Sequence, residues 1–226
     1  MIRLRSILLV VAWTLGGGAF AQSHLAEGFT RLPAGATIAV MPLDVELFSV
    51  TAGGVLEPQA EWTTKAVANL KEALQLRGAG QGGKFVPLPS GDGELLAELN
   101  HLHSAVARAI TIHHFGGWKL PSKAGRLDWS LGEEVAEIRK QGTADYALFV
   151  YLRDSYATGG RVATMVLYAA LGVGVGGGAQ VGYASLVDLR TGRILWFNRV
   201  AKASGDVREL ERAKSTLESL LQEFPG

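Results

Sequence analysis

Ala144-Asp-Tyr-Ala-Leu-Phe-Val-Tyr-Leu152 is the stretch that decides the fold of this chain. It predicts a strand whose two alternating sets of side chains are both apolar. One set is Tyr146, Leu148, Val150 and Leu152, and the other is Ala147, Phe149 and Tyr151. A strand that is apolar on both faces is buried on both faces, so we expect helices to cover each side of its sheet.

Three further strands are predicted after this one, as an antiparallel meander. Gly159-Gly160 turns the chain at little conformational cost, and the β-branched and aromatic residues 162–171 are expected to return as a strand. A glycine-rich tip over residues 172–178 leads to a strand over residues 180–189, and Gly192 turns the chain into a last strand over residues 194–200.

The rest of the chain predicts helices that pack on a mixed sheet, so the fold class is α/β (α+β) with a C-terminal four-strand meander and a C-terminal helix. A first strand ends near Met41-Pro42, and an edge strand covers residues 84–88. Helices are expected from Pro58 to Gly78, over residues 94–115 with Asp92 as cap, and at two capping boxes. These boxes are Ser130 to Glu133, whose helix ends at Gly142, and Asp206 to Glu209, whose helix ends near Phe224.

The N-terminus predicts export. Residues 1–5 carry Arg3 and Arg5, residues 6–18 are uncharged, and Ala19-Phe-Ala21 offers a small-x-small cleavage site. This pattern is typical of a secretory signal peptide that is cleaved after Ala21, and the glycines at 16–18 argue against an uncleaved anchor. We expect residues 1–21 to be the signal peptide, residues 22–35 a lead-in segment and residues 36–226 a single α/β domain.

Charge and cysteine content exclude several kinds of protein. Cleavage removes two arginines and no acid, so the formal net charge falls by two, from +1 to −1, which gives no support for nucleic-acid binding. The chain has no cysteine, which excludes disulfides, thiolate metal sites, cysteine nucleophiles and lipidation of a lipobox cysteine. We therefore expect a periplasmic protein that is not a lipoprotein, either free or associated with the outer membrane by other means.

No catalytic, metal or cofactor site is predicted. The helical histidines His101, His103, His113 and His114 lack the i, i+4 spacing of a chelating pair and are expected to be partly exposed. Gly172, Gly174 and Gly177 match G-x-G-x-x-G, but they follow a predicted strand late in the chain instead of opening a helix. No G-x-S-x-G motif is present, and no serine is placed beside a histidine and an acid.

Six residues are candidates for partner contact. Trp118 and Trp129 stand in a Gly-, Pro- and Lys-containing loop and either form a contact surface or fold back over the core, which we favour. The other four flank the Gly159-Gly160 turn and either form a contact patch or simply decorate a hairpin, which we favour; they are Arg153, Asp154, Tyr156 and Arg161.

The stretch from Val162 to Val187 contains no charged residue. A helix of this length is able to span a bilayer, but its six glycines, Gln180 and its β-branched residues favour strands. We expect a glycine-rich hairpin tip, with a membrane-inserting hairpin or helix as the alternative.

Three short motifs resemble domains of bacterial envelope proteins: Ile38-Ala-Val-Met-Pro42, Ala144-Asp-Tyr-Ala-Leu-Phe-Val150 and Val187-Asp-Leu-Arg-Thr-Gly-Arg-Ile-Leu-Trp196. They look like the first strand, the "AD-Y-apolar" strand and the "D-x-x-T-G-x-x-x-W" hairpin of the curli-secretion lipoprotein family, its exopolysaccharide-export relative and the amino-terminal domain of the Tol translocation protein. The resemblance implies a non-enzymatic periplasmic domain that assembles with envelope proteins, often as oligomers. This chain departs from the lipoproteins because it lacks the lipidated cysteine.

We expect an accessory, assembly or adaptor component of the envelope, whose partners are envelope proteins or further copies of the chain. A periplasmic small-ligand binder or hydrolase is the first alternative, with its site at the strand ends near Asp44 and Glu46, two acids that are otherwise expected to be solvated loop residues. The second alternative is an oligomer that inserts into a membrane through the glycine-rich hairpin.

Overall fold

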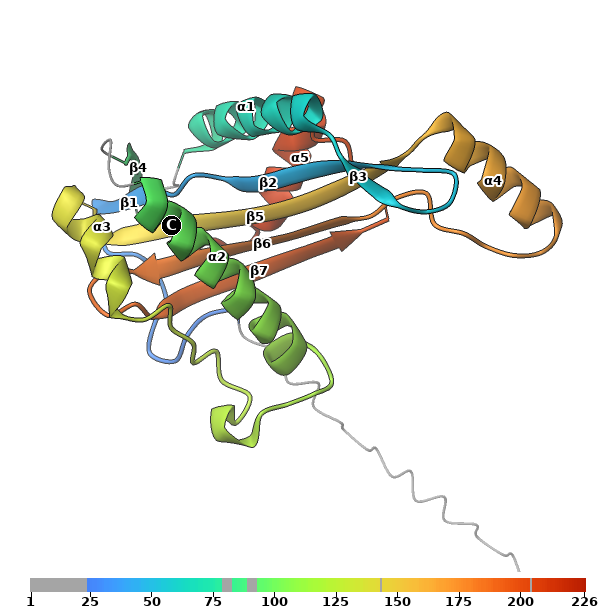
Figure 1. Cartoon of the computed structure of the whole chain (residues 1–226). Coiled ribbons are helices and arrows are strands. Elements are labelled where there is room, and N and C mark those ends of the chain that lie inside the picture. Colours follow the sequence, from blue (N-terminus) through green and yellow to red (C-terminus); the bar gives the residue numbers. More distant parts are fainter. Residues whose placement is uncertain (1–23, 79–82, 89–92, 143, 204) are drawn as a thin grey trace, which may run out of the picture.

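The computed structural model describes residues 24–78, 83–88, 93–142, 144–203 and 205–226. One mixed sheet has helices on both faces (Figure 1). Its seven strands are β1 (Ala36–Val40), β2 (Asp44–Val50), β3 (Leu56–Pro58), β4 (Gly83–Pro87), β5 (Tyr146–Ala157), β6 (Gln180–Asp188) and β7 (Ile194–Lys202). The α-helices are α1 (Ala60–Arg77), α2 (Gly93–Ile110), α3 (Ala136–Gln141), α4 (Gly159–Ala170) and α5 (Leu210–Leu220). A π-helical turn, Thr111–Phe115, extends α2, and short 3-10 turns cover Pro121–Lys123 and Glu133–Val135.

Strand β5 is the centre of the sheet. Along one of its edges it pairs in parallel with β1 and then with β2, and along the other edge it pairs antiparallel with β6. Strand β7 pairs antiparallel with β6, β4 runs parallel to β1, and β3 runs antiparallel to β2. Strand β4 has β1 as its partner and lies at the edge of the sheet, which confirms the edge position predicted for residues 84–88.

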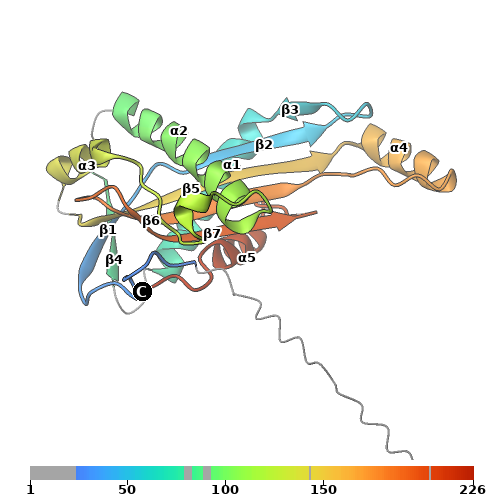
Figure 2. The same cartoon turned by 90° about the horizontal axis from the view of Figure 1, so that it is seen from below.

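The two faces of β5 are buried in two separate cores. Leu148, Val150 and Leu152 pack with α1 and α5, whereas Ala147 and Phe149 pack with α2, α3 and the loop before α3. The double apolar alternation of residues 144–152 therefore predicted correctly that helices cover both faces. Figure 2 shows α2 and α5 on opposite sides of the strands.

The predicted strand over residues 162–171 is wrong, because these residues form helix α4. Its N-cap is Thr158, whose Oγ1 accepts a hydrogen bond from the backbone N–H of Arg161 at 3.2 Å. Both edges of β5 are already taken, one by β1 and β2 and the other by β6, so no place beside β5 is left for a returning strand. The meander has three strands, β5, β6 and β7, and the glycines of residues 172–178 connect a helix to β6.

Several local predictions also need correction. Asp44 and Glu46 lie in strand β2, not in a loop after the first strand, and β3 was not predicted at all. Neither capping box forms: Ser130 Oγ accepts from Gly132 N at 3.0 Å and Asp206 Oδ1 from Arg208 N at 3.3 Å, so both side chains make local turns. The predicted helix ends at Gly78 and Gly142 are confirmed. Asp92, the expected cap of α2, lies outside the described residues.

Candidate interaction surface

Helix α4 projects beyond the end of the sheet. In both views it stands away from the layers formed by α1, α2 and α5, joined to them by the end of β5 and by the glycine-rich return to β6 (Figures 1 and 2). No residue of α4 is buried. A helix normally packs an apolar stripe on a core, and α4 does not do so within one copy of the chain.

The side chains that α4 exposes are apolar. Val166 is 66% exposed, Leu167 is 63% exposed and Leu171, which caps the helix, is 70% exposed. The other large apolar residues exposed on α4 and just after it are Val162, Tyr168 and Val173. Since contiguous exposed apolar surface of this kind marks interaction sites, α4 is the candidate site of this molecule.

The turn between β2 and β3 lies at the base of α4. The Arg161 guanidinium donates from Nε and Nη2 to the Gly176 carbonyl at 2.9 and 2.8 Å, and from Nη1 to the Ala52 carbonyl at 3.5 Å. Arg161 thus ties the helix, the glycine-rich return and this turn together. Beyond the turn, Val55 and Leu56 add exposed apolar side chains to the same end of the molecule.

A buried polar network lies where β5 leads toward α4. Asp154 is almost fully buried, and its Oδ2 accepts from the Tyr156 hydroxyl and, at 2.8 Å, from Gln180 Nε2. Desolvation by burial raises the pKa of Asp154, although these hydrogen bonds oppose the rise. Gln180 in turn accepts from the Thr216 hydroxyl at 3.2 Å, so the network joins β5, β6 and α5.

Arg153 faces the opposite side of β5 from Asp154 and Tyr156, as neighbouring residues of a strand do. Its guanidinium pairs with the carboxylates of Asp44 at 2.7 Å and Glu46 at 3.4 Å, and lies 4.2 Å from the ring centre of Tyr151. The four charged and aromatic candidates around residues 153–161 therefore do not share one patch.

The two loop tryptophans differ. Trp129 packs against the core on the α2 side, with Lys123 Nζ 5.0 Å from its ring centre, in agreement with the favoured interpretation. Trp118 is 79% exposed, and its carbonyl accepts from His113 Nδ1 at 2.7 Å. Trp118 is thus the one predicted contact residue whose side chain stands largely in solvent.

A histidine and a serine far apart in sequence meet inside the protein. His103 Nε2 lies 2.8 Å from Ser185 Oγ, and the ring stacks on Phe149 at 5.0 Å. Burial lowers the pKa of His103 to about 3, so the ring is neutral. Sequence reasoning missed this pair and expected partly exposed histidines, but His103 and His114 are buried. Because both residues are shielded from solvent, the pair stabilises the packing of α2 against β6.

Within the described ranges, no group of three His, Asp or Glu side chains is arranged to hold a metal ion. Among the same residues, no helix combines the length and the apolar character needed to cross a membrane. The uncharged stretch 162–187 is also not one surface, because Gln180 and the six residues from 182 to 187 are mostly enclosed in β6 between β5 and β7.

No protein-family model and no curated protein sequence matches the chain. Among solved structures, a PelC dodecamer from Paraburkholderia phytofirmans is 12% identical, covers 88% of this chain and 93% of its own, and has a TM-score of 0.39. The LpoB C-terminal domain from Escherichia coli is 16% identical over 78% of this chain and 87% of its own, with a TM-score of 0.31. The lipoprotein GNA1162 from Neisseria meningitidis is 15% identical over 74% and 79%, with a TM-score of 0.32. These TM-scores are too low to carry an argument, so the resemblance to the curli-secretion family and its relatives stays a prediction.

Proposed function

We propose that this chain is a non-enzymatic exported envelope protein that acts by assembly, and that helix α4 is the contact through which two copies associate. The observation that carries the proposal is that α4 projects from the sheet without a single buried residue. An apolar helix with no buried residue gains free energy when a partner covers its exposed side chains. Export rests on residues 1–21 and is part of the proposal.

The absence of charge on α4 beyond Arg161 favours a second copy as its partner. From residue 162 to residue 178 the sequence has no Asp, Glu, Lys or Arg. Two identical helices that meet about a two-fold axis bring identical groups close together, and like charges there would repel. Val162 and Val166, one turn apart, instead offer a surface that is complementary to itself. Val55 and Leu56, at the same end, extend the contact.

A membrane is the second candidate for this surface, and the geometry of α4 argues against it. With twelve residues, α4 is about 18 Å long, whereas the hydrocarbon core of a bilayer is about 30 Å thick. A helix that lies on a membrane normally carries Lys or Arg toward the lipid head groups. The one cation of α4, Arg161, is bound to backbone carbonyls at the base of the helix.

The proposed ligand or hydrolase site at Asp44 and Glu46 has less support. Both carboxylates pair with the guanidinium of Arg153, which neutralises part of the charge that a ligand or a reaction would use. Trp118, which is exposed in the loop after α2, is proposed as a separate contact for another envelope protein.

Cysteine cross-linking tests the contact directly, because the natural chain has no cysteine. Val166→Cys places a single thiol on the proposed contact face of α4, and mild oxidation is expected to give a disulfide-linked dimer. Leu76→Cys is the matched control, because Leu76 is 65% exposed on α1 and Val166 is 66% exposed. Equal yields from both variants, or no dimer from Val166→Cys, would refute contact between two α4 helices through this face.

A further inference from the structure

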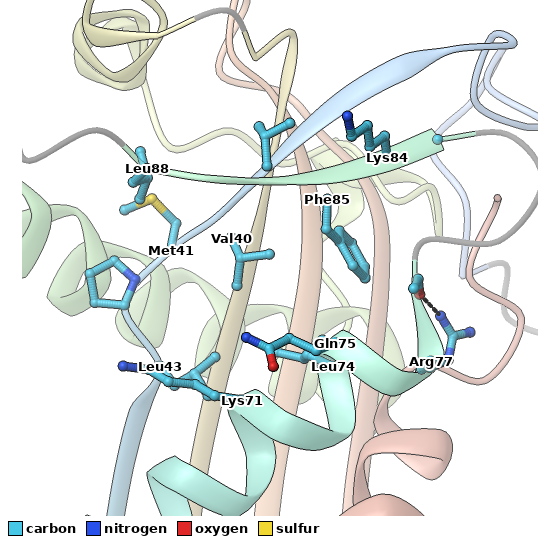
Figure 3. A pocket seen from close by; sticks show the side chains of 14 residues that line it. Val40, Met41, Leu43, Lys71, Leu74, Gln75, Arg77, Lys84, Phe85 and Leu88 are labelled. Atoms are coloured by element: carbon cyan, nitrogen blue, oxygen red, sulfur yellow. Dashed lines mark hydrogen bonds between the residues drawn. The ribbon is translucent and has the colours of Figure 1, made fainter.

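A cavity of about 970 Å³ lies between the C-terminal half of α1 and the strands β1 and β4 (Figure 3). Its volume is at the upper end of the range for small-molecule sites. Of its apolar lining residues, Val40, Leu43, Leu74 and Phe85 belong to the core on the α1 side, whereas Met41, Val86 and Leu88 pack on the opposite face of the sheet. The cavity is therefore large enough, and apolar enough, to hold a hydrocarbon chain.

The packing of α1 explains why this space is open. Helix α1 packs against β2 and α5, while β4 lies at the far edge of the sheet, beyond β1. Val40 of β1 and Phe85 of β4 point toward α1 without filling the gap, and both stay only partly buried (Figure 3). Hydrophobic side chains left half-covered in a concave site favour an apolar ligand.

The charge at the cavity is positive. Lys71 and Arg77 belong to α1 and line it, and among the described residues that line it none is acidic. Arg77 is held in place, because Nη1 donates to the Gly78 carbonyl at 3.1 Å and Nη2 to the Leu221 carbonyl at 3.3 Å. Glu218 of α5 acts electrostatically on Arg77 but does not line the cavity.

Lys71 is the more adaptable of the two cations. Its side chain is exposed, and it has no ion pair within the part of the chain that the structure describes. A third cation, Lys84, belongs to strand β4, which forms one wall of the cavity. Its side chain points away from α1 (Figure 3). An apolar cavity whose described charged residues are all cations favours an anion that has an apolar body.

We propose that the cavity binds a fatty acid, with its hydrocarbon chain against Val40, Leu74 and Phe85 and its carboxylate at Lys71. This site is separate from α4 and does not depend on the function proposed above. The carboxylate gains a charge-assisted hydrogen bond from Lys71, and the chain covers the half-buried wall of the cavity.

The test measures binding of cis-parinaric acid, a fluorescent fatty acid, to protein expressed from the full chain, and its displacement by palmitate or by hexadecanol. Palmitate is expected to displace the probe roughly tenfold better, because only palmitate carries the charge that Lys71 attracts. Lys71→Glu is expected to weaken palmitate binding by about the same factor. Lys65→Glu, an equal charge change at an exposed position of α1 outside the cavity, should leave binding unchanged.

A second pair of variants tests the location. Val40→Trp fills the cavity and is expected to abolish binding, whereas Val55→Trp, at an exposed position of the β2–β3 turn, is expected to preserve it. Thermal melting shows whether each variant is folded. Equal displacement by palmitate and hexadecanol, absence of probe binding, or unchanged binding by folded Val40→Trp would overturn the proposal. If the natural chain forms a dimer and Val40→Trp dissociates it, then the cavity is occupied by a second copy of the chain. This result would also overturn the fatty-acid proposal.

Discussion

The guanidinium of Arg153 lies 2.7 Å from the carboxylate of Asp44, and its Nη1 also donates to the Asp44 backbone carbonyl at 3.0 Å. The side chains are 28% and 19% exposed, so water weakens the pair less than it weakens a pair on the open surface. Asp44 begins β2 and Arg153 lies within β5, which means that this pair fixes β2 against β5 where their parallel pairing starts. Glu46, 3.4 Å from the same guanidinium, extends the attachment by two residues.

Replacement of Arg153 by alanine is therefore expected to lower the free energy of unfolding by about 1–2 kcal/mol. Urea denaturation measures the change. Arg190→Ala serves as control, because Arg190 pairs with Asp188 but is 70% exposed, and its loss is expected to cost less than about 0.5 kcal/mol. Equal losses in the two variants would show that the Arg153 pair does not fix β2.

Gly192, in the turn between β6 and β7, is expected to tolerate no side chain. Its φ is +70°, and a Cβ atom there would come within 2.0 Å of the Gly132 carbonyl oxygen. Gly192→Ala should destabilise the fold by more than about 2 kcal/mol, since strain of the left-handed backbone adds to this clash.

Gly125→Ala is the control for Gly192→Ala. Gly125 has a φ of +75°, but a Cβ atom added there would meet no other atom within 4 Å. Its substitution should cost only the backbone strain, about 1 kcal/mol. Chemical denaturation measures the loss in free energy of unfolding for each variant, and the difference between the two losses is the cost of the clash with Gly132. Identical losses would contradict a close approach between residue 192 and the Gly132 carbonyl.

The buried side chain of His103 is expected to make the stability of the protein depend on pH. Burial lowers its pKa in the folded protein from 6.5 to about 3. Between these values the unfolded chain binds more protons than the folded one, so stability is full above pH 6.5 and falls as the pH decreases toward 3. Because of His103, we expect the free energy of unfolding to fall by about 1–2 kcal/mol from pH 7 to pH 5.

The variant His103→Gln is expected to remove this part of the pH dependence, while His101→Gln, at an exposed position on the same helix, should keep it. Urea denaturation at several pH values gives the comparison. If the natural chain and His103→Gln lose stability in parallel as the pH falls, then His103 is not the group responsible.

The central part of the fold could be predicted from local sequence alone. Two apolar alternations in one strand require cover on both faces, and β5 has that cover from α1 and α5 on one side and from α2 on the other. Edge position also follows from local chemistry, because the prolines at 87 and 89 disfavour a central strand, and β4 lies at the edge.

The candidate site could not be predicted in the same way. The composition of residues 162–171 suits a strand as well as an exposed helix, and the outcome depends on β1, β2 and β6 already occupying both edges of β5. A local signal for the helix existed in Thr158 as an N-cap, followed by Val162, Met165, Val166 and Ala169 at helical spacing. The pairing of His103 with Ser185 joins residues 82 positions apart, and no sequence periodicity connects them.

The absolute mass of the protein in solution, measured by light scattering after gel filtration with and without mild detergent, tests the central claim most directly. We predict an oligomer in both conditions for the natural chain and a monomer for Val166→Lys, with Leu76→Lys, at a similarly exposed position on α1, still an oligomer. A natural chain that is a monomer in both conditions, or that assembles only in detergent, would contradict the proposal that α4 joins two copies of this protein.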